Sequence, residues 1–162
     1  MALDDKDERE ESRKRDEAVG QGAAGSERKP RVLIIDDEPS IRFALRRFFA
    51  RMGWDVSEAA DGRAALSLIM STSSEAGGGS VAANYDMVLS DVRMPGLSGI
   101  QLYERIKAER PDIIARLVFS TGDTSGTEIA EFVSRIGCPV VPKPFRLSDL
   151  QDIAERLLRT ES

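Results

Sequence analysis

The stretch Leu89-Ser90-Asp91-Val92-Arg93-Met94-Pro95-Gly96-Leu97-Ser98-Gly99 decides the fold class and contains the candidate reactive group. The apolar residues 87–89 predict a short buried strand that ends beside Asp91, and the Pro95-Gly96 turn leads into a helix. In open α/β sheets, ligands bind at the carboxyl ends of the strands. Asp91 therefore has the position of a binding or reactive residue.

Three other short apolar runs also end at residues that can carry chemistry. They are Asp36 and Asp37 after residues 32–35, Ser120 and Thr121 after residues 117–119, and Lys143 after residues 140–142. If these strands are parallel neighbours, their carboxyl ends meet at one edge of the sheet. We therefore expect three carboxylates, a hydroxyl group and an ammonium group to converge on Asp91.

The composition is that of a globular chain without histidine. A length of 162 residues favours one domain, and no apolar run approaches the ~18 residues of a membrane span. A charged start and a single cysteine, Cys138, favour a cytoplasmic protein without a secretory signal or an internal disulfide. The lack of histidine excludes imidazole catalysis and histidine metal sites. A net charge of −5 argues against a nucleic-acid surface over the whole protein.

Two segments contain too few large apolar side chains to fold on their own. Residues 1–30 hold nine acidic and seven basic residues, so we expect a disordered charged tail, with a docking or targeting arm as the alternative. Residues 71–84 are rich in small side chains and predict a long flexible loop.

From residue 31 to residue 159, short apolar strands alternate with helical periodicity. The expected strands are residues 32–35, 55–59, 87–90, 116–120 and 139–141. The helix signals between and after them are Pro39 in a first turn, an Asp61 cap, a stop at Pro111, capping boxes at Ser125/Glu128 and Ser148/Gln151, and terminal glycines at 53 and 137. In the first helix, the apolar stripe is Ile41, Ala44, Leu45, Phe48 and Met52. This alternation predicts a flavodoxin-like, doubly wound (βα)5 domain: a five-stranded parallel sheet of order 2-1-3-4-5 between two helical layers.

The predicted site would concentrate negative charge. Two like charges ~4 Å apart repel by ~4 kcal/mol at an effective dielectric constant of ~20, so Asp36, Asp37 and Asp91 need a cation nearby. Oxygen ligands without histidine or cysteine favour Mg²⁺, with Mn²⁺ as a possible substitute. Three carboxylates, one divalent ion and Lys143 sum to zero charge.

A carboxylate neutralised in this way can attack phosphorus. The metal and Lys143 would stabilise the phosphoryl oxygens, and Thr121 could donate a hydrogen bond to the attached group. Each residue alone has an ordinary structural explanation, such as a solvated acidic pair or a turn aspartate. Their joint occurrence at successive strand ends favours the functional interpretation.

The chain resembles a response regulator receiver domain of two-component signalling. The resemblance covers about residues 31–159. It rests on Ile35-Asp36-Asp37-Glu38, Asp91-Val92-Arg93-Met94-Pro95 with Gly99, Ser120-Thr121-Gly122, and Val141-Pro142-Lys143-Pro144-Phe145. It implies that Asp91 accepts a phosphoryl group from a phosphohistidine on a histidine kinase or a phosphotransfer protein.

The same resemblance implies a set of site roles. Mg²⁺ would be held by Asp37, Asp91 and the backbone carbonyl of Arg93, with Asp36 contributing, often through water. Lys143 and Thr121 would bind the phosphoryl group, and the peptide bond from Lys143 to Pro144 would be cis. Only three residues follow the last expected helix, so we expect a stand-alone receiver, either a monomer or a phosphorylation-dependent dimer.

Two departures from the family pattern concern switching and dephosphorylation. Many receivers carry an aromatic residue three positions before the lysine, where this chain has Val140, so we expect Phe119 or Phe132 to repack instead, or the coupling to be weak. Arg93 and Asp123 occupy two variable positions at the mouth of the site. We hypothesise that they pair and restrict attacking water; two solvated charges are the alternative.

Other function classes fit less well. A Mg²⁺-dependent phosphohydrolase with an aspartate nucleophile is the main alternative, but such enzymes place two acids two residues apart after the first strand, whereas Asp36 and Asp37 are adjacent. A nucleotide-binding module would need a glycine-rich phosphate loop after residues 32–35, and none is present. We also find no basic recognition element for DNA.

Overall fold

The computed structural model describes residues 29–71, 85–122 and 126–159. It contains a five-stranded sheet of order β2-β1-β3-β4-β5, and all four strand pairs are parallel. This confirms the predicted flavodoxin-like fold. Residues 1–28 and 72–84, which hold most of the predicted tail and loop, lie outside the described residues, as does Asp123.

Strands and helices alternate along the chain. The strands are β1 (Arg31–Ile35), β2 (Asp55–Ala59), β3 (Met87–Asp91), β4 (Leu117–Thr121) and β5 (Val140–Pro142). The helices are α2 (Pro39–Arg51), α3 (Gly62–Ser71), α4 (Gly99–Glu109), α5 (Thr127–Ile136) and α6 (Leu147–Arg159), with a short 3₁₀ helix, η2 (Pro111–Arg116), before β4. The helix η2 was not predicted from the sequence. Asp91 and Thr121 are the last residues of β3 and β4, one residue beyond the predicted strand ends.

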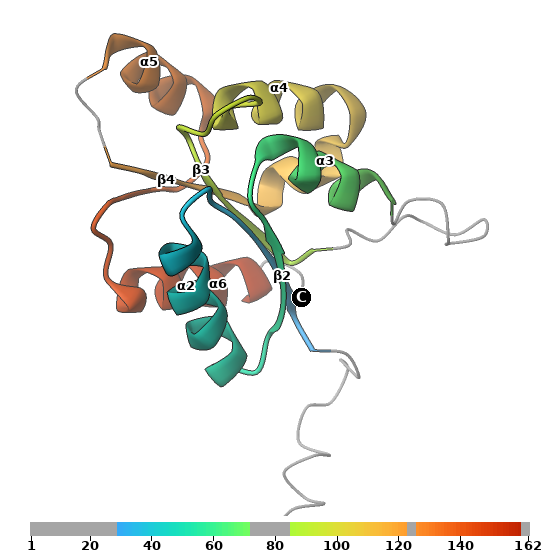
Figure 1. The fold of residues 1–162 in the computed structure, drawn as a ribbon, viewed down its shortest axis with the longest axis vertical. Coiled ribbons are helices and arrows are strands. Elements are labelled where there is room, and N and C mark those ends of the chain that lie inside the picture. The colour runs from blue at the N-terminus through green and yellow to red at the C-terminus, as the bar shows by residue number, and fades with distance from the viewer. Residues whose placement is uncertain (1–28, 72–84, 123–125, 160–162) are drawn as a thin grey trace, which may run out of the picture.

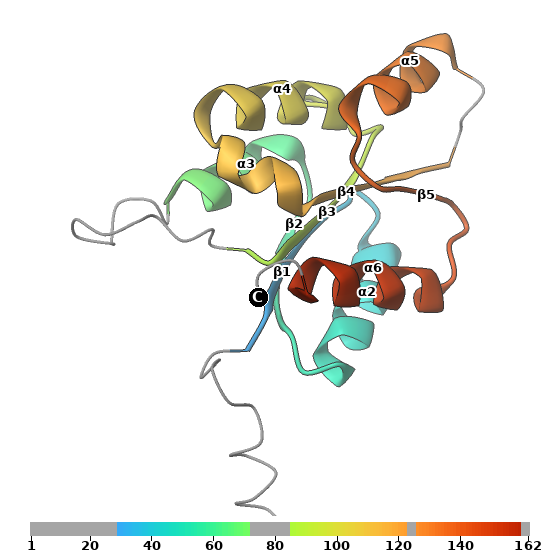
Figure 2. The same ribbon diagram turned by 180° about the vertical axis from the view of Figure 1, so that it is seen from behind.

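Helices cover both faces of the sheet. Figures 1 and 2 show α2 and α6 on one face and α3, α4 and α5 on the other. Because side chains alternate along a strand, Val32 and Ile34 pack toward α2 and α6, whereas Leu33 and Ile35 pack toward α3, α4 and α5. The strands are therefore apolar on both faces, and polar groups are left to their carboxyl ends.

The predicted apolar stripe of α2 is partly wrong. Leu45 and Phe49 are its buried residues, whereas Ala44 is exposed. Phe49 packs edge-to-face on Trp54 with ring centroids 5.5 Å apart. The larger ring takes the centre of the buried face because it removes more apolar surface from water than the alanine methyl group.

Helix ends confirm some of the predicted caps. The Oδ1 atom of Asp61 accepts a hydrogen bond from the Ala64 N–H at 2.8 Å, so Asp61 caps α3 as expected. Gly137 ends α5 with a φ of 67°, the left-handed conformation that glycine adopts without strain. The predicted capping residue Ser148 is wrong, since α6 begins one residue earlier at Leu147. The N-cap of α5 is Gly126, without a side-chain hydrogen bond.

A buried arginine joins α3 to the segment around η2. The Arg110 guanidinium donates to both carboxylate oxygens of Asp112, at 2.9 and 2.8 Å, and to the carbonyl oxygen of Ile69 at 2.9 Å. Arg110 is only 7% exposed, so its charge depends on these partners. This contact bridges 41 residues of sequence.

We expect Arg110→Met to lower the free energy of unfolding by about 2–3 kcal/mol, because it removes charged hydrogen bonds and leaves the Ile69 carbonyl without this donor. Urea denaturation measures the loss. Arg105→Met is the matched control: Arg105 forms an exposed i,i+4 pair with Glu109, and its loss should cost less than about 0.5 kcal/mol. Equal losses in the two variants would contradict a structural role for Arg110.

The same pair gives a pH dependence. The hydrogen bond from Arg110 to the Asp112 carboxylate lowers the pKa of Asp112, and the guanidinium charge adds a weaker effect in the same direction. Burial of Asp112 opposes both effects. An acid with a lowered pKa in the folded state stabilises that state above its ordinary pKa and loses this contribution as the pH falls through the lowered value. The difference in stability between the wild type and Asp112→Asn should therefore shrink in acid.

Candidate functional site

The carboxyl edge of the sheet brings the predicted site residues together. Asp36 and Asp37 directly follow β1, Asp91 ends β3, Thr121 ends β4, and Lys143 directly follows β5. The register places Asp91 beside Ser120 and Thr121 beside Pro142. These side chains therefore lie at one edge of the sheet because the strands that carry them are parallel.

Three carboxylates form a compact cluster. One carboxylate oxygen from each of Asp36, Asp37 and Asp91 lies within 4.8 Å of the others. Asp36 and Asp91 are buried, at 2% and 7% exposure, whereas Asp37 is exposed. The cluster thus has a closed inner part and one carboxylate that faces solvent.

Lys143 is the counter-charge within this cluster. Its Nζ donates to Oδ2 of Asp36 at 2.9 Å and to Oδ2 of Asp91 at 3.0 Å. Backbone bonds help to fix it, since the Lys143 N–H donates to the Thr121 carbonyl at 2.7 Å. The peptide bond to Pro144 is cis, as the resemblance implies.

Backbone N–H groups orient the two buried carboxylates. The Glu38 N–H donates to Oδ1 of Asp36 at 2.9 Å, and the Arg93 N–H donates to Oδ1 of Asp91 at 3.3 Å. The Arg42 guanidinium also donates to the Asp36 backbone carbonyl at 2.6 Å, which anchors α2 to the site. No pattern in the sequence predicts this contact.

The pKa shifts show that one ammonium group is shared. Burial raises the pKa of Asp91, and the negative charge of Asp36 adds to this effect, against the hydrogen bond and charge of Lys143. Burial alone would lower the pKa of Lys143, but the hydrogen bonds and charges of Asp36 and Asp91 outweigh it and raise that pKa. Lys143 bonds two carboxylates, so Asp36 and Asp91 share a single positive charge. The negative charge of the site is therefore only partly neutralised, which favours binding of a further cation.

The donor set fits a hard divalent cation. Three carboxylates and one ammonium leave a formal charge of −2, and all the clustered donors are oxygens. Asp36, Asp37 and Asp91 would hold the ion; Asp36 and Asp91 each already accept one backbone N–H bond and one bond from Lys143, whereas Asp37 is exposed.

We expect Mg²⁺ to stabilise the protein, because an ion that binds only the folded state adds about 2.7 kcal/mol at a concentration 100 times its dissociation constant. Urea denaturation with a chelator and then with saturating Mg²⁺ measures this gain. Asp37→Asn should lose most of the gain, and Glu38→Gln, an exposed acid next to the cluster, should keep it. A gain of equal size in Asp37→Asn would place the ion elsewhere.

A ring cluster lies behind Thr121, on the side of the sheet covered by α4 and α5. Phe119 is edge-to-face with Phe132 at 5.2 Å and with Tyr103 at 6.4 Å between ring centroids, and Tyr103 contacts Phe132 at 5.5 Å. Val140 pairs with Phe119 in the sheet. The two phenylalanines singled out from the sequence are thus buried against each other, and Phe119 lies two residues before Thr121 in β4.

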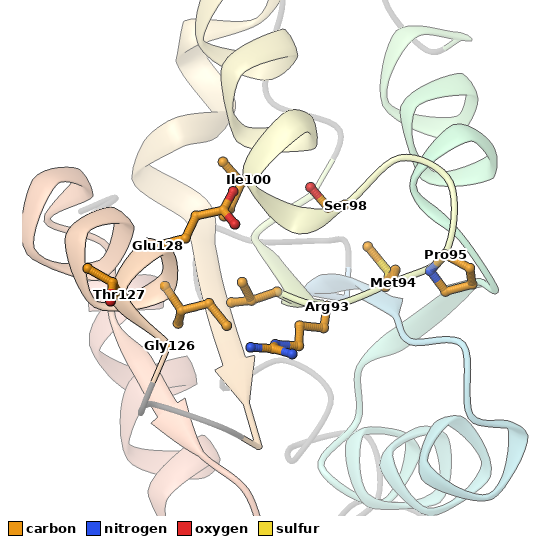
Figure 3. Close-up of a pocket in the computed structure, with 10 residues that line it drawn as sticks. Arg93, Met94, Pro95, Ser98, Ile100, Gly126, Thr127 and Glu128 are labelled. Carbon is orange, nitrogen blue, oxygen red and sulfur yellow. The ribbon is translucent and has the colours of Figure 1, made fainter.

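A separate pocket of about 550 Å³ lies beside the acidic cluster, between the β3–α4 loop and the start of α5 (Figure 3). Arg93, Met94 and Pro95 line one side, and Gly126 and Glu128 line the other. A Cβ atom on Gly126 would lie 3.2 Å from a guanidinium nitrogen of Arg93, so this side chain reaches toward α5. The predicted partner of Arg93, Asp123, is outside the described residues.

Comparison with known proteins identifies a domain type. Residues 32–155 match the family model described as the response regulator receiver domain. The chain is 32% identical over 130 residues to the transcriptional activator protein PfeR of Pseudomonas aeruginosa. It is also 32% identical over 129 residues to the response regulator MprA of Mycolicibacterium vanbaalenii. Each alignment covers 80% of this chain but only 38% of PfeR and 50% of MprA, so the chain spans half or less of these relatives.

Two solved structures of receiver proteins have the same fold as this chain over nearly their whole length. The chemotaxis protein CheY4 of Vibrio cholerae is 25% identical with a TM-score of 0.65, and 99% of it is matched by 80% of this chain. The receiver domain of the Francisella response regulator 1452 is also 25% identical, with a TM-score of 0.66 and coverages of 100% and 83%. Within the described ranges, no helix is both long enough and apolar enough to cross a membrane.

Proposed function

The chain belongs to the response regulator receiver domain family, and from this membership we propose that Asp91 accepts a phosphoryl group from a phosphohistidine on a partner protein. The observation that carries the proposal is the acidic cluster with its shared lysine. Asp91 lies at the carboxyl end of the central strand, within 4.8 Å of two other carboxylates, and its Oδ2 accepts a hydrogen bond from Lys143.

The proposed transfer forms one bond and breaks another. A carboxylate oxygen of Asp91 attacks phosphorus, the P–O bond forms as the P–N bond to imidazole breaks, and the leaving nitrogen keeps the electron pair. Lys143 is already within 3.0 Å of the carboxylate, so its ammonium group can neutralise phosphoryl oxygens there. The Thr121 hydroxyl, at the end of the adjacent strand, would donate to another phosphoryl oxygen.

The residues suited to Mg²⁺ are Asp36, Asp37 and Asp91, with the backbone carbonyl of Arg93 as a further oxygen donor. When bound, the ion would supply charge neutralisation at the phosphoryl oxygens. Burial of Asp36 and Asp91 lowers the effective dielectric constant in the inner part of the cluster, which would strengthen the attraction between Lys143 and the transferred group.

We further propose that the product acts as a cytoplasmic signal through protein binding or as an intermediate in a phosphorelay. The aspartyl phosphate adds negative charge and acceptor oxygens beside Thr121 and Lys143. Movement of Thr121 would be transmitted to Phe119 along β4 and then to Phe132 on α5. Other receivers instead use an aromatic residue at the position of Val140. The direct output would be a phosphorylation-dependent contact with another protein or a second copy, not DNA binding.

Phosphotransfer from purified, radiolabelled histidine kinases and phosphotransfer proteins tests the function. We expect one donor to load about one phosphoryl group per chain in the presence of Mg²⁺, and Asp91→Ala to load none. Repeated turnover of a phosphate ester, without a stoichiometric phosphoprotein, would instead support the phosphohydrolase alternative and refute the receiver proposal.

A further inference from the structure

One helix face differs in charge from the rest of this acidic chain. Helix α2 contains four arginines and no acidic residue in 13 positions, whereas the whole chain has a net charge of −5. Arg42 and Arg46 interact with Glu58 of β2, at 3.8 and 3.5 Å. Among the described residues, no carboxylate pairs with Arg47 or Arg51. The outer face of α2 is therefore basic and only partly compensated.

An aromatic ring lies in the middle of this basic face. Phe43 is 51% exposed. Among the described residues only one other large apolar side chain, Leu147, is exposed, and it is exposed to a smaller extent. The guanidinium carbons of Arg46 and Arg47 lie 5.4 and 5.7 Å from its ring centroid. Aromatic and arginine side chains are enriched in protein interfaces, because they combine apolar area with directed charge. Phe43, Arg46, Arg47 and Arg51 are called the α2 patch below.

The chain carries a complementary sequence at its own start. Residues 4–11, Asp-Asp-Lys-Asp-Glu-Arg-Glu-Glu, contain six acidic and two basic residues, and Leu3 directly precedes them. The apolar Leu3 can contact the exposed Phe43 ring, and residues 4–11, with a net charge of −4, are complementary to the arginines around that ring. Among residues 1–28, only Met1, Leu3 and Val19 have large apolar side chains. Val19 follows Asp16 and Glu17, but residues 13–15 before them are basic, so a strongly acidic surrounding is found only at Leu3.

The attachment point of this segment is near enough to the α2 patch. The Asp55 N–H donates to the Pro30 carbonyl at 2.8 Å, which fixes the start of β1 beside the turn that follows α2 (Figure 1). Helix α2 is ~20 Å long at 1.5 Å per residue. A random-coil chain of ~19 residues, the number that separates residues 11 and 30, has a root-mean-square span of ~22–26 Å, and a tether of that length gives millimolar effective concentrations.

We propose that the acidic segment of residues 3–11 docks on the α2 patch of the same chain. Docking covers Phe43 and neutralises Arg47 and Arg51. The docking itself does not depend on the proposed phosphoryl chemistry.

Paramagnetic broadening in the full chain tests the docking. A nitroxide is attached at Ala2→Cys in a Cys138→Ser background, and backbone amide signals are compared before and after reduction of the label. We expect selective broadening of α2 residues 43–51 over α4 and α5, which cover the opposite face of the sheet. At ~1 M salt, where the Debye length is ~3 Å, the broadening should be lost.

Charge variants show whether the match is specific. Arg47→Glu with Arg51→Glu should abolish the selective broadening, and adding Asp7→Lys, Glu8→Lys and Glu11→Lys should restore it. Arg63→Glu with Lys107→Glu is the matched control, since it makes the same charge change at exposed positions of α3 and α4 and should leave the broadening intact.

Three results would overturn the proposal. They are broadening without preference for α2, broadening that survives Arg47→Glu with Arg51→Glu, and broadening that appears only between a labelled chain and a separate isotope-labelled chain. The last result would assign the α2 patch to a second copy. Phosphoryl loading of Asp91 is measured separately, so a failed docking test leaves the proposed function standing, and the reverse also holds.

Discussion

Asp91→Asn is expected to abolish phosphoryl loading and, in the absence of divalent ions, to make the fold more stable. The amide of asparagine is not a nucleophile toward phosphorus, so loading should fall to background. The stability gain has a different cause. Carboxylate oxygens within 4.8 Å of one another repel by ~3–4 kcal/mol at an effective dielectric constant of ~20, and Lys143 offsets most of this repulsion. Removing one charge should therefore stabilise the metal-free protein by about 1 kcal/mol.

Addition of Mg²⁺ should reverse the order of the two proteins. The wild type gains binding energy from three carboxylates, whereas Asp91→Asn has lost one of them, so the wild type becomes the more stable protein at saturating Mg²⁺. Urea denaturation with a chelator and with Mg²⁺ measures both halves of this result. If Asp91→Asn is less stable than the wild type under both conditions, Asp91 has a structural role that charge repulsion does not describe.

The placement of the site could be predicted because it depends on local patterns and one topology. Asp36, Asp91, Thr121 and Lys143 each lie at the end of a short apolar run, and parallel strands bring such ends to one edge. The contact between Lys143 and Asp36 spans 107 residues, yet it follows once the strand order is chosen. The predicted ends of β3 and β4 were one residue too early. Asp91 and Thr121 belong to the strands, and their place at the edge of the sheet is unchanged.

Other features could not be predicted because they depend on side-chain packing between distant elements. The contact of Arg110 with the Ile69 carbonyl joins the end of α4 to α3, and the sequences of these two elements show no shared pattern. The exposure of Ala44 and the burial of Phe49 depend on the rotation of α2 about its axis, which the sheet below determines. The ring cluster of Tyr103, Phe119 and Phe132 combines residues of α4, β4 and α5, and the sequence of no single element indicates that these rings meet.

Gly99→Ala is expected to be among the most damaging single-methyl additions to this fold. A Cβ atom at residue 99 would lie 2.5 Å from the carbonyl oxygen of Asp91 and 2.8 Å from the Cα of Val92. Both neighbours are backbone atoms, so no side-chain rotation relieves the overlap. Overpacking of this kind typically costs about 1–3 kcal/mol, and a backbone clash places Gly99→Ala at the upper end.

The same substitution should also slow phosphoryl loading, because the strain falls on the residue that carries the nucleophile. The Gly99 N–H donates to the Val92 carbonyl at 2.9 Å, so displacement of α4 pulls on the strand end where Asp91 lies. Gly96→Ala is the control. It has open space around its Cβ position and a φ of 77°, so it should cost about 1–2 kcal/mol from backbone strain alone and leave loading nearly unchanged. Equal losses of stability and loading in both variants would show that loop conformation, and not the close approach of α4 to Asp91, explains the glycine at position 99.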